Sequence, residues 1–111
     1  MTSCVEIIER YCPPGTPLHA VLTGHSRQVA DMAVSIATRL AAAGQAVDVA
    51  FTGQAAMLHD IGIVWVDAPS IHCHGTEPYI RHGVLGRVLL EQLELPRHAL
   101  VCERHTGAGI T

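Results

Sequence analysis

Aromatic and charged side chains are scarce in this sequence of 111 residues, at 4% and 15% of the total, whereas apolar residues make up 49%. This composition excludes an intrinsically disordered chain, because such chains carry too little apolar surface to build a core. The scarcity of aromatics favours helices that pack through Leu, Ala, Val and Ile. We therefore expect a single globular, all-α domain over residues 1–111, since this length suits one domain with its own core.

Basic residues do not outnumber acidic ones, since seven face ten and the formal net charge is -3, so no nucleic-acid surface is expected. The four cysteines form no Cys-X-X-Cys pair, which argues against a secreted disulfide scaffold and predicts a reducing, cytoplasmic setting. The first twelve residues lack the basic and apolar regions of a signal peptide. No run approaches the ~18 apolar residues of a membrane-spanning helix, so no membrane partner is expected.

Five helices are predicted, over residues 4–11, 18–43, 49–59, 79–93 and 96–105. The longest has apolar residues three and four positions apart, a spacing that predicts one buried face; they are Val29, Met32, Ala33, Ile36, Ala37 and Leu40. Gly44 is suited to end this helix and Asp48 to cap the next. Residues 61–78 show no clean period and are predicted to form an irregular loop. The prediction is an all-α bundle of about five helices.

The eight histidines are the unusual feature of the composition. Four of them extend the apolar faces of four different helices, and one is followed directly by an aspartate; the residues are His25, His59, Asp60, His82 and His105. A single histidine on an apolar face is more often a hydrogen-bonded core residue than a ligand. Four such positions on separate helices, however, are the arrangement that builds a metal site inside a bundle. A cation would also offset the burial of the carboxylate, which is otherwise costly.

The remaining histidines fit this pattern less well. His98 is expected on a solvated face. His72, Cys73 and His74 lie in the irregular loop, where three ligands of this type could bind Zn²⁺ or Cu. We favour a polar loop near the mouth of the site over a second metal site there, and His19 receives no role.

The ordered set of His25, His59-Asp60, His82 and His105 resembles the HD-domain superfamily of metal-dependent phosphohydrolases. Residues 59–62, His-Asp-Ile-Gly, are similar to one form of the family signature. Residues 25–30 resemble the family's first-histidine helix. Residues 81–86 and 103–110 resemble the later histidine segments of a subgroup of small members. The resemblance covers residues 18–111 and implies an HD-type helical bundle.

The resemblance also implies a role for each residue. His25, His59 and Asp60 would hold a first divalent ion, and Asp60 would bridge to a second ion held by His82 and His105. Family members hydrolyse phosphomonoesters or phosphodiesters, often of nucleotides. The implied activity is therefore hydrolysis of a small phosphorylated, nucleotide-like molecule, with His59 and Asp60 at the reacting centre.

Imidazole and carboxylate ligands suit Mn²⁺, Fe²⁺, Co²⁺, Ni²⁺ or Zn²⁺ better than Ca²⁺, which prefers oxygen ligands. Two histidines and a carboxylate leave coordination positions open, so water can bind and lose a proton near neutral pH. With two ions ~3.5–4 Å apart, the resulting hydroxide can attack phosphorus while both ions neutralise phosphoryl oxygens. One or two transition-metal ions are therefore expected.

The sequence departs from the family pattern in two ways. The family usually adds an aspartate from a later helix, and none follows His105, so we expect an HD bundle that lacks the usual late helix. Many members carry a phosphate-binding lysine after the glycine of the signature, where this chain has Ile63. Arg81 and Arg104 are expected to supply that positive charge, with Arg87 as a further candidate.

These departures leave two alternatives to a phosphohydrolase. One is a degenerate HD module with a binding or regulatory role, and the other is a di-iron oxygenase on the same ligand set. A bundle without its late helix would also expose apolar surface. Because exposed apolar patches tend to mark interfaces, a homodimer is expected.

Overall fold

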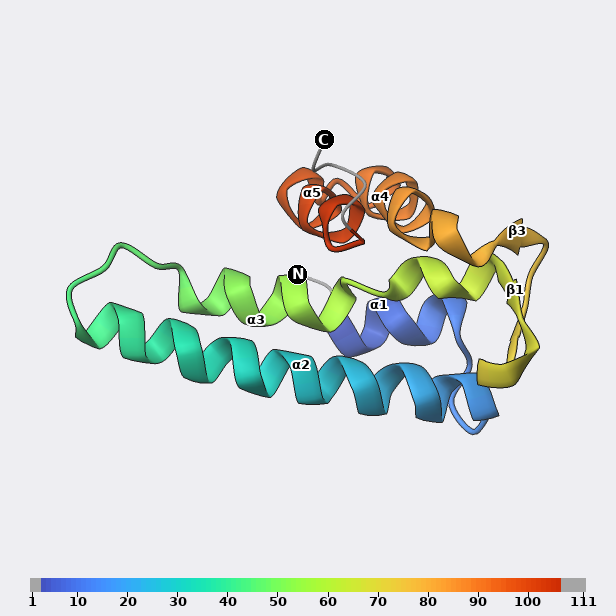
Figure 1. Ribbon diagram of the computed structural model, residues 1–111, viewed down its shortest axis with the longest axis horizontal. Helices are drawn as coiled ribbons and strands as arrows, with labels where there is room; N and C mark the ends of the chain where they lie inside the picture. The colour runs from blue at the N-terminus through green and yellow to red at the C-terminus, as the bar shows by residue number, and fades with distance from the viewer. Residues whose placement is uncertain (1–2, 107–111) are drawn as a thin grey trace.

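Five α-helices account for most of residues 3–106, the part of the chain that the computed structural model describes (Figure 1). They are α1 (Cys4–Tyr11), α2 (Pro17–Ala42), α3 (Val49–Leu58), α4 (His82–Gln92) and α5 (Pro96–Arg104). The prediction of an all-α bundle of about five helices is confirmed. Only the start of α4 was clearly misplaced, because residues 79–81 form a separate 3₁₀ turn, η3 (Tyr79–Arg81). The loop predicted after residue 105 lies largely outside the described residues.

Local capping explains where α2 and α3 begin and where α2 ends. The side chain of Thr16 accepts a hydrogen bond of 3.2 Å from the backbone N–H of His19 at the start of α2. Asp48 caps α3 in the same way, with Oδ1 3.0 Å from the N–H of Phe51, as predicted. Gly44 follows α2 at a φ of +89°, a left-handed conformation that glycine adopts without strain.

The segment between α3 and α4 is more ordered than the sequence predicted. It contains two 3₁₀ helices, η1 (Ile61–Trp65) and η2 (Pro69–Ile71), and a small sheet of β1 (Val66–Ala68), β2 (Cys73–His74) and β3 (Glu77–Pro78). Strand β1 lies in the centre, antiparallel to β2 and parallel to β3. The expectation of a wholly irregular loop was therefore wrong, because strands of two or three residues are too short to show an alternating pattern.

Two helical hairpins form the body of the molecule. Helices α2 and α3 run side by side along its length, and α4 and α5 form a second pair stacked across them (Figure 1). The 3₁₀ helix η1 lies beneath α4, so the chain directly after α3 is clamped between the two hairpins. Fully buried aliphatic residues fill the space between these elements; they include Ile8, Leu22, Leu58, Ile61, Leu89 and Leu90.

The predicted buried face of α2 is covered only in part. Ala37 is buried, but Met32, Ile36 and Leu40 are 68%, 50% and 44% exposed. The periodicity correctly marks an apolar face, but α2 has 26 residues and α3 only 10, so the far half of α2 has no full cover. Despite its length, neither α2 nor any other described helix is apolar enough to cross a membrane.

Candidate metal centre

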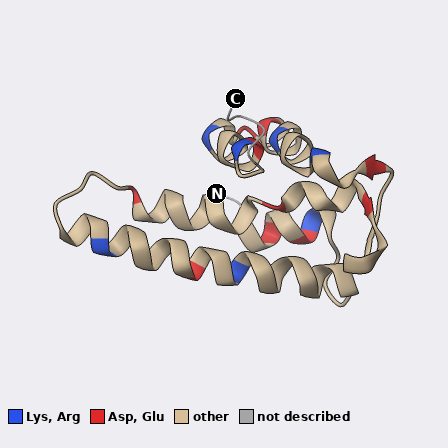
Figure 2. Cartoon of the chain, in the orientation of Figure 1, with Lys and Arg blue, Asp and Glu red and all other residues tan. Residues whose placement is uncertain are grey.

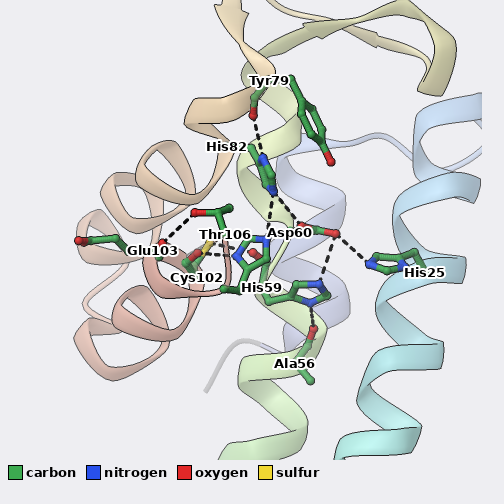
Figure 3. A network of polar contacts seen from close by, with 10 residues as sticks. His25, Ala56, His59, Asp60, Tyr79, His82, Cys102, Glu103 and Thr106 are labelled. Atoms are coloured by element: carbon green, nitrogen blue, oxygen red, sulfur yellow. Dashed lines mark hydrogen bonds and ion pairs between the residues drawn. The ribbon is translucent and has the colours of Figure 1, made fainter. Parts of the chain in front are cut away.

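Asp60 lies at the centre of four imidazole rings that come from four different helices or their ends (Figure 3). Its Oδ2 is 3.0 Å from His25 Nε2 and 3.3 Å from His59 Nε2. Its Oδ1 is 3.3 Å from His82 Nε2 and 2.9 Å from His105 Nε2. The structure thus brings together all five residues that the sequence nominated as metal ligands. They form two groups that share only Asp60, one with His25 and His59 and the other with His82 and His105.

The same local geometry aims three of the four rings. His59 and His105 each sit at the C-terminal end of a helix, and His82 ends η3 and begins α4. In each case Nδ1 donates a hydrogen bond to the carbonyl three residues earlier: Ala56 for His59, Tyr79 for His82 and Cys102 for His105. A carbonyl can only accept, so Nδ1 carries the hydrogen and Nε2 of the neutral ring keeps its lone pair. This backbone contact is the usual way in which a metal-binding histidine is held in one orientation.

The donor atoms of this cluster suit a cation. Because Nε2 of His82, His105 and His59 each carries a lone pair, the rings present electron pairs toward the Asp60 carboxylate. The Nε2 atoms of His82 and His105 are only 3.0 Å apart. Lone pairs this close repel one another unless positive charge lies between or beside them. A divalent transition metal supplies that charge, and neutral imidazole with carboxylate is a donor set that such metals accept.

Gly62 allows the cluster to assemble. A Cβ atom at this position would overlap the backbone carbonyl of His82 and the N–H of Gly86. The glycine therefore lets η1 approach the first turn of α4 closely, which brings His82 next to Asp60. Gly86 serves the neighbouring contact, because a Cβ there would collide with the Cys102 sulfur on α5. The glycine two positions after Asp60 in the sequence motif thus has a steric reason.

Burial and charge keep the carboxylate ionised. Burial alone would raise the pKa of Asp60, but when the His105 and His59 rings are protonated, their hydrogen bonds and charge outweigh burial and hold this pKa well below its usual range. For His59, burial lowers the pKa, while Asp60 and the Ala56 carbonyl raise it, and the net effect is a raised pKa. Asp60 is therefore an anionic group at neutral pH, as a ligand shared between two sites must be.

The cluster lines the floor of an open cleft of about 620 Å³. His82 and His59 are buried, whereas the His25 side chain is 51% exposed and faces the cleft, so its predicted burial was wrong. Tyr79, Ile80 and Thr106 complete the wall. The Tyr79 ring packs against His82, with ring centroids 4.5 Å apart. Sequence reasoning missed these three residues, since no pattern marks an exposed side chain on the 3₁₀ turn η3 or directly after α5 as part of a site.

The arginines predicted to contact phosphate occupy different surroundings. Arg81 is exposed and pairs with Glu77 at 3.4 Å. The Arg87 guanidinium joins α4 to α5, 2.6 Å from Glu103 and 3.0 Å from Glu91. Arg104 lines a shallow hollow that it shares with His105. None of the three is among the described residues that line the cleft: Arg104 lies in a separate hollow that includes only His105 of the cluster, and Arg87 is held by two carboxylates.

The second cluster of possible ligands in the sequence, His72-Cys73-His74, does not converge. His72 caps η2 in a left-handed conformation, and on β2 the Cys73 side chain is buried while His74 is exposed. Successive side chains of a strand point to opposite faces, so the three cannot surround one ion. Within residues 3–106, only the two groups around Asp60 have metal-binding geometry. Asp67 lies exposed on β1, outside both groups.

The last two histidines also lie outside the cluster. His19 pairs with Glu9 at 3.4 Å. His98 was expected on a solvated face but is partly buried, with Nε2 3.0 Å from Gln54 Oε1 and its ring edge against Phe51. The expectation for His98 was wrong because its partners come from α3, which sequence spacing within α5 cannot reveal.

Comparison with known proteins supports the interpretation of the cluster. The HD-domain family model matches residues 22–111. An uncharacterised protein of Methanocaldococcus jannaschii is 36% identical over 88 residues, which make up 78% of this chain and 46% of that protein. The chain therefore spans about half the length of this relative. No solved structure matches the chain.

Proposed function

This chain belongs to the HD-domain family of metal-dependent phosphohydrolases, and we propose that it hydrolyses a phosphomonoester or phosphodiester with the help of one or two divalent transition-metal ions. The ions expected on chemical grounds are Mn²⁺, Fe²⁺, Co²⁺, Ni²⁺ or Zn²⁺. The expectation of a nucleotide-like substrate comes from the family resemblance, and it remains a prediction.

The position of Asp60 is the observation that carries this proposal. Each of its carboxylate oxygens faces a different pair of histidines, Oδ2 toward His25 and His59 and Oδ1 toward His82 and His105. A carboxylate that faces two ligand pairs in this way can bridge two ions. Bound ions would supply positive charge to the phosphoryl oxygens and lower the pKa of water enough to make it a nucleophile at neutral pH.

Other groups of the chain would orient the metal ligands and give the substrate access to the site. The backbone carbonyls of Ala56, Tyr79 and Cys102 hold the imidazoles in place before substrate arrives. The open cleft admits both a phosphoryl group and water. In the reaction an oxygen from water bonds to phosphorus, the ester P–O bond breaks, and the departing alcohol takes up a proton. The expectation that Arg81 or Arg104 attracts the phosphate remains a prediction; Arg104 shares a neighbouring hollow with His105.

The experiment is phosphate release from aryl phosphate mono- and diesters by protein reconstituted with each metal in turn. Turnover is expected with at least one of these metals, and Asp60→Ala should abolish it. Asp67→Ala is the matched control, because Asp67 is an exposed aspartate outside the cluster. Activity that survives in Asp60→Ala would rule out the proposed site.

The same metal-reconstituted protein also tests the two alternatives, an oxygenase and a binding or regulatory module. An iron-specific reaction that consumes O₂ would indicate an oxygenase on the same ligands, a possibility supported by Ile63, which is buried and apolar where many members have a lysine. Failure to retain any metal, with no turnover, would favour a binding or regulatory module.

A further inference from the structure

Helix α3 has an unusual surface for a helix near the outside of a protein. Residues Val49–Leu58 include no charged side chain (Figure 2). Apolar residues occur on every side of this helix. A helix with this composition is normally enclosed by other elements. In the part of the chain that the structure describes, α2, α1 and α5 cover part of α3, but the side between α2 and α5 is left open as a groove of about 310 Å³.

The groove has apolar walls and a shallow floor. Val29 and Ala33 of α2 form one wall, Val101 of α5 forms the other, and Ala55 and Phe51 of α3 lie between them. The only hydroxyl in the lining, that of Thr52, already donates a hydrogen bond of 2.8 Å to the Asp48 carbonyl. The Phe51 ring is held from outside by Arg97, whose guanidinium carbon lies 4.0 Å from the ring centroid. The groove is thus a firm apolar surface with few free hydrogen-bonding groups.

One end of the groove adjoins the metal cleft. His59 and His105 line both hollows, and their rings meet edge to face with centroids 4.9 Å apart. These two rings therefore form the boundary between the cluster and the groove. A group attached to a phosphate at the cluster could pass this boundary and lie along α3.

We propose that this groove binds the organic group of the phosphoester and that this group is apolar, an aryl or alkyl chain; the proposal rests on the phosphohydrolase function above. An apolar group gains free energy by leaving water for such a surface. A sugar would lose the water bound to its hydroxyls and find almost no partners in return, which is unfavourable. The geometry therefore favours an aryl or alkyl phosphoester over a nucleoside one.

A small molecule suits the groove better than a helix from another protein. The volumes of the groove and the cleft, about 310 and 620 Å³, lie within the range of roughly 300–1,000 Å³ typical of ligand pockets. The groove also ends at two of the proposed metal ligands, where the reacting phosphate must lie.

The test compares 4-phenylbutylphosphonate with methylphosphonate, since neither can be hydrolysed at its C–P bond. Their affinities for the metal-loaded protein are measured by calorimetry. We expect the phenylbutyl compound to bind about tenfold more tightly. Ala33→Leu should fill the groove and remove most of this preference without weakening methylphosphonate. Ala41→Leu is the control, because Ala41 is an exposed alanine of the same helix outside the groove, and it should change neither affinity.

Several outcomes would overturn the proposal. They are equal affinity for the two phosphonates, no binding of either, or a preference that Ala33→Leu leaves intact. A dimer that Ala33→Leu converts to a monomer, without any aryl preference, would instead identify the groove as a subunit interface. Hydrolysis is scored separately with phenylbutyl phosphate: a binding preference without turnover would keep the groove and reject the proposed function. Turnover without the binding preference would keep the proposed function and reject the groove as the binding site.

Discussion

His82 and His105 turn their Nε2 atoms toward each other across 3.0 Å, although the two residues lie 23 positions apart in the chain. The backbone fixes the orientation of both rings, since Nδ1 of each ring donates a hydrogen bond to a backbone carbonyl. The contact therefore cannot be a hydrogen bond between neutral rings, because neither Nε2 has a hydrogen to give. Asp60 Oδ1 lies beside both Nε2 atoms, so three hydrogen-bond acceptors converge on a position that suits a cation.

Removal of metal should destabilise the protein. A ligand that binds only the folded state stabilises it by about 2.7 kcal/mol at a hundredfold excess over its Kd. For a domain of this size that corresponds to a fall in Tm of about 10 °C on chelation. The measurement is thermal unfolding by circular dichroism with and without a chelator, followed by addition of Mn²⁺ or Zn²⁺. A Tm that is unchanged by the chelator and by added metal would contradict the site.

Gly62→Ala should damage both fold and metal binding. The new Cβ would overlap the His82 carbonyl, so η1 and α4 must move apart, and the cost is expected to be about 3 kcal/mol of the free energy of unfolding. Gly24→Ala is the matched control. A Cβ at Gly24 on α2 meets nothing within 4 Å, and this change should stabilise the helix by roughly 0.5–1 kcal/mol. Urea unfolding measures the stability of both variants, and their metal content is measured in parallel. Equal stability of the two variants would refute the steric role of Gly62.

Cys102 should resist alkylation in the folded protein. Its side chain is fully buried, and its thiol donates to the His59 carbonyl at 3.0 Å. Burial and the nearby Asp60 carboxylate raise the pKa of the thiol to about 12. Because the thiolate is the reactive form, only roughly one thiol in ten thousand is reactive at pH 8. Peptide mass spectrometry after iodoacetamide treatment should find Cys4, which is partly exposed, modified much faster. Equal rates before denaturation would contradict this packing.

A homodimer through α2 is predicted from the exposed residues Met32, Ile36 and Leu40. Ile36→Glu should place a charge in such an interface and produce a monomer, whereas Thr38→Glu, a nearby exposed position, should not. Light scattering at micromolar concentration measures the mass of each. A wild-type monomer, or a dimer insensitive to Ile36→Glu, would exclude this interface.

The helices could be predicted because their signals are local. Thr16, Asp48 and Gly44 act on the backbone within four residues of themselves, so the sequence alone places the ends of α2 and the start of α3. The strands could not be predicted, since β2 and β3 have two residues each and depend on pairing with β1. The exposure of Met32 was likewise beyond the sequence, because periodicity does not report what lies opposite a helix face.

The cluster around Asp60 was predictable for a related reason. His59, His82 and His105 each lie at the end of a helix or turn, so the direction of each ring follows from local spacing once the helices pack. His25 lies within α2, and its side chain is half exposed. Tyr79 and the groove beside Phe51 were not predictable, because they exist only where three or more elements meet. Gly62 lies between these cases: its presence in the motif is visible in the sequence, but the clash with His82 that explains it is not.

The most direct test of this account is the transition-metal content per chain of freshly purified protein, measured by plasma mass spectrometry. Asp60→Asn keeps the size of the side chain but removes the charge that both ligand pairs share, and Asp67→Asn makes the same change at an exposed position outside the cluster. We predict one to two ions per chain in the wild type and in Asp67→Asn, and none in Asp60→Asn. A wild type that stays free of metal after incubation with Mn²⁺, Fe²⁺ or Zn²⁺, or an Asp60→Asn variant that binds metal as the wild type does, would contradict the central claim.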